Sequence, residues 1–152
     1  MTAKAGSVQP ENNPYSINPI IGGEPAGQKE FPFNVVFYSK DLAKVDGKKL
    51  SYDLNGANFC GGTLIQSKWI LTDAHCIDLF GSSYANIGVA LGINQLKGSV
   101  KTTADFKSTF FNVVTAVRHE YYKTMPNNYD IGLVQINDSF KNGLIYLPNP
   151  KN

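Results

Sequence analysis

Short apolar segments alternate with polar, turn-forming clusters along this chain from residue 20 onward. The apolar segments are rich in Val, Ile and Phe and the clusters in Gly, Asn, Asp and Ser, which is typical of strands joined by turns. No long stretch has the period of a helix. Several short strands with frequent turns indicate an all-β fold, either a sandwich or a barrel. Strands are predicted at residues 31–38, 58–66, 68–72, 86–93, 109–118 and 130–136.

Three polar stretches precede or interrupt this pattern. Residues 1–19 are polar and contain three prolines, so we expect a disordered N-terminal extension or propeptide there. Residues 39–56 are rich in lysine and are predicted to form an exposed insertion, and residues 94–108 form a second polar stretch. The expected organisation is an extension followed by one β domain over residues 20–152.

Composition and charge exclude several classes of protein. The chain has 152 residues, of which 42% are hydrophobic and 17% charged, so it is globular and long enough for one domain or half of a two-domain protein. A net charge of +2 is too balanced to favour nucleic acid or a membrane surface as partner. No apolar run approaches the length of a transmembrane helix, and the N-terminus lacks the apolar region of a signal peptide.

The stretch WILTDAHCID, residues 69–78, holds one of the two histidines and one of the two cysteines of the chain. A single histidine in an apolar segment is more often a core residue than a catalyst. Two cysteines are compatible with a disulfide, free thiols or metal ligands. A zinc site would have to combine His75, Cys76, Cys60 and His119, which are scattered over about sixty residues instead of forming close pairs. We therefore expect no metal and no other cofactor.

Acyl transfer offers a third interpretation of the histidine. A nucleophilic serine needs a neutral imidazole to accept its proton, and the imidazole needs a carboxylate that fixes its tautomer. Asp130 stands directly before a predicted buried strand, a position that would hold its carboxylate rigidly. Taken alone, an aspartate at the start of a strand is an ordinary feature.

Four motifs together change the interpretation. In chain order they are IIGGEPAGQKEFPF from Ile20, FCGGTLIQSKWILTDAHC ending at Cys76, VRHEYYKTMPNNYDIGLVQI from Val117, and LPN from Leu147. This succession resembles the chymotrypsin-like (trypsin-like) serine protease family. The resemblance covers about residues 20–149, and its two middle motifs are highly specific.

The resemblance implies a fold and a set of residue roles. The fold would be an antiparallel six-stranded β-barrel, the N-terminal barrel of a chymotrypsin-like double-barrel domain. His75 would be the general base and acid, and Asp130 its orienting carboxylate. Cys60 and Cys76 would form a disulfide that closes a 15-residue loop, worth roughly 3 kcal/mol. Ile20 would be the N-terminus created by activation.

Other residues are also assigned by the resemblance. Gly61 and Gly62 would allow a close approach of the backbone. His119 matches a surface position of the family and receives no catalytic role.

The chain departs from the family pattern in three respects. It contains no Gly-Asp-Ser-Gly-Gly motif, so we expect a fragment that lacks the nucleophilic serine and is inactive by itself. Pro19 precedes Ile20, where the family usually has Arg or Lys. Asp73 replaces the usual alanine two residues before the histidine, and it either raises the pKa of His75 or points into solvent.

These observations predict a serine endopeptidase that hydrolyses peptide bonds through an acyl-enzyme. The alternatives are a non-catalytic homologue that acts as a binding or regulatory module, and a gene fragment with no independent existence. The expected partners are protein or peptide substrates, protease inhibitors and the missing C-terminal barrel. A disulfide implies an oxidising compartment, so we expect a secreted, extracellular protein.

Overall fold

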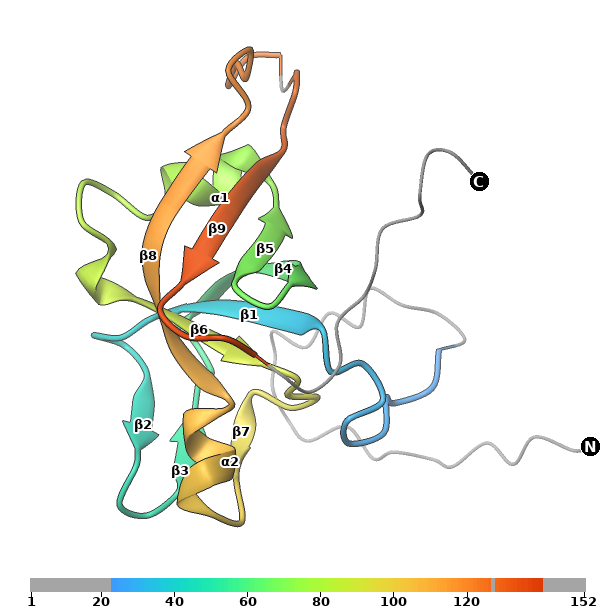
Figure 1. The fold of residues 1–152 in the computed structure, drawn as a ribbon, viewed down its shortest axis with the longest axis vertical. Coiled ribbons are helices and arrows are strands. Elements are labelled where there is room, and N and C mark those ends of the chain that lie inside the picture. The colour runs from blue at the N-terminus through green and yellow to red at the C-terminus, as the bar shows by residue number, and fades with distance from the viewer. Residues whose placement is uncertain (1–22, 127, 141–152) are drawn as a thin grey trace, which may run out of the picture.

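The computed structural model describes residues 23–126 and 128–140. Within them, six strands form a closed antiparallel barrel in the order β1-β4-β5-β9-β8-β6 (Figure 1). All six predicted strands are confirmed. Of the two architectures that the strand pattern allowed, a sandwich or a barrel, the structure has the barrel. The expected extension over residues 1–19, and Ile20, lie outside the described residues. The barrel strands are β1 (Asn34–Ser39), β4 (Asn58–Gln66), β5 (Trp69–Thr72), β6 (Ile87–Leu91), β8 (Phe110–Arg118) and β9 (Gly132–Ile136).

The barrel encloses an apolar core because alternate residues of its strands point inward. On β9, Gly132, Val134 and Ile136 are buried, while Leu133 between them is exposed. β6 is buried at all five positions, because a second apolar cluster covers its outer face. The largest fully buried side chains of the barrel core are Phe37, Leu64, Ile70, Ile136, Val35, Val89 and Val134.

A three-stranded sheet packs on the outside of the barrel at one end (Figure 1). It consists of β2 (Lys44–Asp46), β3 (Ser51–Asp53) and β7 (Lys97–Ser99), and it lies beside α2 (Thr103–Lys107). The prediction of an exposed insertion over residues 39–56 is therefore wrong at Tyr52 and Leu54, whereas Leu42 is exposed as expected. Tyr52 and Leu54 are buried among the lysines, and the ring of Tyr52 packs edge-on against Phe110 at 5.4 Å. The second cluster comprises Tyr38, Tyr52, Leu54, Ala57 and Ala90.

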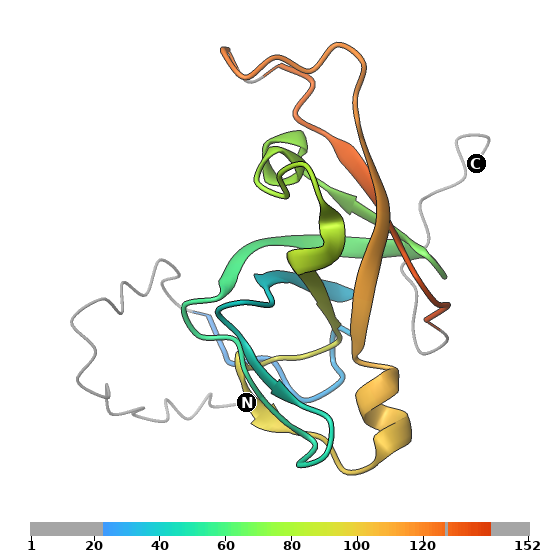
Figure 2. The ribbon, with the colours of Figure 1, turned by 90° about the vertical axis from the view of Figure 1, so that its left-hand side faces the viewer.

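The remaining helices are single turns. α1 (Ala74–Asp78) follows β5, and η1 (Tyr84–Asn86) is a short 3-10 helix before β6. α1 lies at the opposite end of the barrel from the three-stranded sheet (Figures 1 and 2). No helix of the described residues is long and apolar enough to cross a membrane.

A disulfide joins α1 to the barrel wall. Cys60 on β4 is bonded to Cys76 on α1, with their Cα atoms 6.0 Å apart, and no described cysteine is free. This confirms the pairing implied by the family resemblance. The expected close approach of the backbone is also present at Gly62. A Cβ added there would lie only 2.8 Å from the carbonyl oxygen of Leu71 on the neighbouring strand.

The packing of α1 on the barrel can be tested at Gly132. A Cβ at Gly132 would lie 2.4 Å from Cδ1 of Ile77 on α1 and 2.9 Å from the carbonyl oxygen of Val117. Gly132→Ala should therefore lower the free energy of unfolding by about 1–3 kcal/mol, the usual cost of overpacking. Denaturant titration measures the change. The matched control is Gly27→Ala, whose Cβ meets nothing closer than 3.5 Å; equal stability of the two variants would contradict the prediction.

Candidate active site

The pairing of β5 with β9 brings the two predicted catalytic residues to one end of the barrel. The last pair of this ladder joins Thr72 to Gly132. His75 lies three residues after Thr72, and Asp130 lies two residues before Gly132. Because the strands are antiparallel, the chain leaves both of them at the same edge. Residues 55 positions apart in the sequence thus come into contact.

The Asp130 carboxylate caps the first turn of α1. The first N–H groups of a helix have no partner within the helix and need one from outside. Asp73 occupies the N-cap position, but its side chain makes no capping hydrogen bond. Instead, the backbone N–H of His75 donates to Oδ1 of Asp130 at 2.8 Å. The aspartate that caps α1 therefore comes from the segment before β9.

The second oxygen of the same carboxylate contacts the imidazole. Oδ2 of Asp130 lies 2.7 Å from Nδ1 of His75. In the neutral ring this contact requires the proton on Nδ1, which leaves a lone pair on Nε2. The His75 side chain is 48% exposed and that of Asp130 21%. The arrangement is an oriented imidazole with its basic nitrogen free, which is the form that a general base needs.

The two groups shift each other's pKa in opposite directions. The hydrogen bond that the His75 ring donates to Asp130 is the largest cause that raises the pKa of His75 above 6.5, and partial burial opposes it. The pKa of Asp130 is lowered below 3.8, first by the backbone N–H of His75 and then by its ring. Each shift reflects a hydrogen bond that favours the charged form.

These shifts link the site to folding stability. The contribution from His75 is complete below its unfolded pKa of about 6.5 and is lost as the pH rises through its higher folded pKa. The contribution from Asp130 is present above its ordinary pKa and is lost as the pH falls through its lower folded value. Both contributions therefore coexist at mildly acidic pH.

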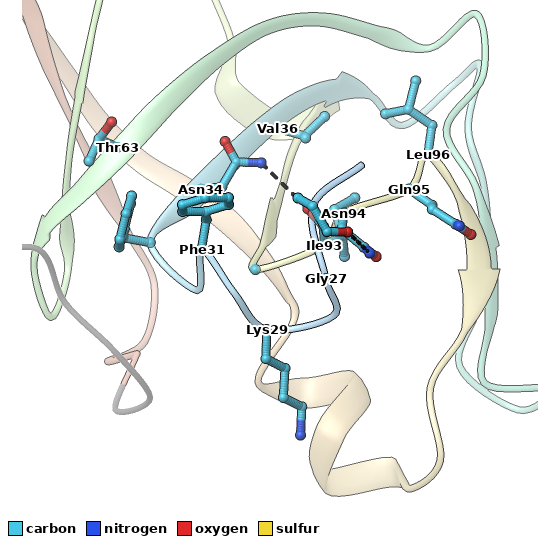
Figure 3. A pocket seen from close by; sticks show the side chains of 13 residues that line it. Gly27, Lys29, Phe31, Asn34, Val36, Thr63, Ile93, Asn94, Gln95 and Leu96 are labelled. Carbon is cyan, nitrogen blue, oxygen red and sulfur yellow. Dashed lines mark hydrogen bonds between the residues drawn. The ribbon is translucent and has the colours of Figure 1, made fainter. Parts of the chain in front are cut away.

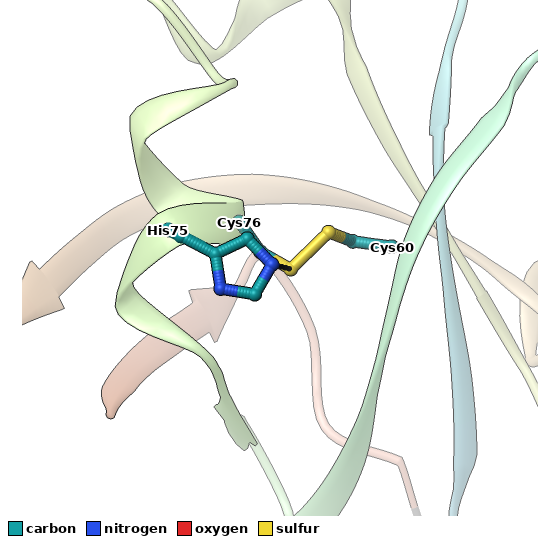
Figure 4. A group of neighbouring side chains, drawn as sticks. All are labelled: Cys60, His75 and Cys76. Carbon is teal, nitrogen blue, oxygen red and sulfur yellow. Dashed lines mark hydrogen bonds between the residues drawn. A yellow bond between two sulfur atoms is a disulfide. The ribbon is translucent and has the colours of Figure 1, made fainter. Parts of the chain in front are cut away.

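The Nε2 edge of the His75 ring lies near the disulfide (Figure 4). Nε2 of His75 is 3.7 Å from Sγ of Cys76. One potential ligand atom from each of Cys60, His75 and Cys76 lies within 4.8 Å of the others. However, both sulfur atoms are bonded to each other, so neither is the thiolate that a zinc ion would require. This cluster does not fit a metal.

Two further carboxylates affect the electrostatics of His75. Asp73 is exposed at the start of α1 and Asp78 is exposed at its end. Their negative charges add to that of Asp130 in raising the pKa of His75. Asp73 was expected either to point into solvent or to raise the pKa of His75. In the structure it is exposed and also makes a minor contribution to the raised pKa of His75. Asp78 also forms an ion pair with Arg118 at the end of β8.

The pocket in Figure 3 belongs to another part of the molecule. It measures about 390 Å³ and lies between the segment before β1 and the connection from β6 to β7. Asn34 and Asn94 cross it with hydrogen bonds to the carbonyl oxygens of Ile93 and Ala26. Lys29 is its single titratable lining residue. It lacks the acid and base groups that hydrolysis needs, so the His75–Asp130 pair is the candidate site.

The structure thus brings together His75, Asp130 and the Cys60–Cys76 disulfide, as the sequence predicts. It also reveals features that sequence reasoning missed. The Asp78–Arg118 ion pair had no recognisable signal, because the two residues are 40 positions apart. The ring of His119, a half-buried residue at the end of β8, stacks on that of Tyr129, which no sequence pattern indicates.

Comparison with known proteins identifies the family. The Trypsin family model matches residues 20–151. The chain is 29% identical over 117 residues to brachyurin of Leptuca pugilator, covering 77% of this chain and 41% of that protein. It is 32% identical over 92 residues to human granzyme M, covering 60% of this chain and 32% of that protein. The chain therefore spans less than half the length of these curated relatives.

A solved structure supports the fold. The VesB protease of Vibrio cholerae superimposes with a TM-score of 0.63 at 23% identity, over 84% of this chain and 33% of that one. At this identity the likeness concerns the fold alone. The family match over residues 20–151 carries the assignment, and the closed six-stranded barrel agrees with it: the chain belongs to the trypsin family of serine proteases.

Proposed function

We propose that this chain supplies the general base and the orienting carboxylate of a serine endopeptidase. The observation that carries the proposal is the double contact of Asp130 with His75, at 2.8 Å to the backbone nitrogen and 2.7 Å to Nδ1. This contact fixes both the position of α1 and the tautomer of the imidazole. Membership of the trypsin family supports a protein or peptide as the substrate.

The reaction would proceed by acyl transfer. Nε2 of His75 accepts the proton of a serine Oγ while that oxygen bonds to the carbonyl carbon of the substrate. The resulting imidazolium is stabilised by Asp130, and it gives the proton to the amine nitrogen as the C–N bond breaks. Water then attacks the acyl-enzyme, His75 takes a proton from it, and the serine oxygen leaves with that proton.

The serine would come from a segment outside these 152 residues. The chain contains no Gly-Asp-Ser-Gly-Gly motif. In the described residues, the His75 ring hydrogen-bonds to Asp130 through Nδ1, and the atom near Nε2 is a disulfide sulfur of Cys76 and not a hydroxyl group. The proposal therefore treats the chain as one part of the catalytic apparatus. Secretion is part of the proposal, because a structural disulfide is typical of an oxidising compartment.

Removing either partner of the pair tests the proposal. In protein that carries the nucleophilic serine, His75→Ala or Asp130→Asn should lower kcat about 10⁴-fold, the size of loss known for the orienting carboxylate of a Ser-His-Asp triad. Steady-state hydrolysis of a peptide substrate measures it. Asp41→Asn is the control, since Asp41 is exposed and lies between β1 and β2, outside the segments that carry His75 and Asp130. A loss below tenfold would exclude these roles, whereas absence of hydrolysis by the parent protein itself would favour a non-catalytic homologue.

The charges around the ring generate a pH prediction. Asp73→Asn and Asp78→Asn each remove a negative charge that favours the imidazolium, so each should lower the pKa of His75. Because kcat/KM rises with pH as the imidazole becomes neutral, the acid side of the pH profile should move to lower pH. NMR titration of the His75 ring checks the shift directly. An unchanged or raised pKa in both variants would contradict the electrostatic analysis.

The chain alone should not form a covalent adduct. A general base without a nucleophile or oxyanion donors can only activate water, and each missing donor costs about 2.7–4 kcal/mol of transition-state stabilisation. Incubation of the 152-residue chain with a serine-reactive phosphonate should therefore give no labelled species in the mass spectrum. Labelling that disappears in His75→Ala would show instead that a serine of this chain is the nucleophile.

A further inference from the structure

The carboxylate of Asp130 is presented by an unfavourable backbone turn. Tyr129 has φ = 56°, a left-handed conformation that is costly for a residue with a Cβ. The N–H of Ile131 donates to the carbonyl oxygen of Tyr129 at 2.8 Å, which closes a three-residue turn with Asp130 at its centre. If Tyr129 relaxed to an ordinary φ, the direction of the Asp130 side chain would change. Some other contact must therefore offset the strain at Tyr129.

His119 makes that contact from the opposite side of the β8–β9 loop, residues 119–131. Its ring stacks on the Tyr129 ring with centroids 4.8 Å apart and planes 14° from parallel. Its backbone N–H donates to the carbonyl oxygen of Ile131 at 2.9 Å. Its Nδ1 accepts the N–H of Tyr121 at 3.2 Å. The imidazole is thus held on its own strand end while its face supports Tyr129.

We propose that His119 is a positioning residue: by stacking on Tyr129 it maintains the turn that directs the Asp130 carboxylate to His75. The inference rests on the proposed function of the His75–Asp130 pair and extends it to a third residue. In the described residues, the side chain of His119 contacts Tyr121 and Tyr129 and makes no hydrogen bond with His75. Its effect passes through one aromatic contact and one backbone turn, both in the described residues.

The pKa of His75 provides a readout that needs no catalysis. The chain has only two histidines, so the ring resonances of His75 are assigned directly, and in His119 variants a single histidine signal remains. Asp130→Asn defines the value of an uncoupled His75. Asp73 and Asp78, the other charges that act on His75, are unchanged in every variant. Differences between variants therefore report the contact with Asp130.

The experiment compares removal of the stack with its retention in the 152-residue chain. His119→Ala and Tyr129→Ala each delete one ring, and alanine at position 129 keeps the Cβ that makes the turn unfavourable. His119→Phe and Tyr129→Phe keep the aromatic faces. Met125→Ala is the matched control, because Met125 belongs to the same loop and is 87% exposed. NMR titration gives the pKa of His75 for each, and the methyl resonances of Val35 and Val89 show that the barrel core is intact.

Both alanine variants should lower the pKa of His75 by at least half of the drop produced by Asp130→Asn. The double variant should show no further drop, since the two residues act through one contact. The phenylalanine variants and Met125→Ala should keep the parent value. Removing a positive charge from position 119 would instead raise the pKa of His75. The direction of the pKa change therefore distinguishes loss of the stack from loss of a charge.

Two results would overturn the proposal, and they are distinguishable from failure of the proposed function. An unchanged pKa in Tyr129→Ala, with the expected drop in Asp130→Asn, would remove His119 from the site and leave the His75–Asp130 pair intact. A drop in His119→Phe equal to that in His119→Ala would assign the effect to Nδ1 instead of the stack. No drop in Asp130→Asn would deny the pair itself.

Discussion

The geometry of the site depends on one carboxylate that bonds α1 at two points. A five-residue helix is far too short to be stable by itself, because its few hydrogen bonds do not offset the free energy needed to nucleate a helix. Asp130 supplies the cap that Asp73 does not provide, and it also orients the His75 ring. One carboxylate therefore both caps the helix and orients the imidazole. Any movement of Asp130 would disturb both the position and the tautomer of His75.

The barrel makes this contact reproducible. Its closed ladder leaves no free edge at which β5 and β9 could slip past each other, so the pairing of Thr72 with Gly132 determines where the chain leaves both strands. The disulfide at Cys76 and the packing of Ile77 on Gly132 hold α1 from two more sides. If the pair acts as proposed, a site held in this way would need little reorganisation when charge develops on the imidazole, which is the basis of electrostatic preorganisation.

Sequence reasoning predicted the barrel strands well, because a strand with one buried face shows its apolar alternation directly. The pairing of His75 with Asp130 also followed from sequence, but from the family motifs and not from any local pattern. Sequence reasoning failed within residues 39–56, because the four lysines of this segment suggested exposure although the side chains of Tyr52 and Leu54 are buried. It also missed the role of Asp130 as a cap and the stack of His119 on Tyr129, because both depend on contacts between distant segments. Local patterns carry no information about such contacts.

The two apolar clusters lie on opposite faces of the same strands. On β1, Val35 and Phe37 face the barrel interior, whereas Tyr38 belongs to the outer cluster with Tyr52 and Leu54. The turn between β2 and β3 is exposed at Lys48 and Lys49 and lies at the far end of the molecule from α1 (Figure 1). Selection can therefore remodel this hairpin without touching the residues that hold the imidazole. Within one small domain, the surface of the hairpin is thus separated from the pair proposed to carry the chemistry.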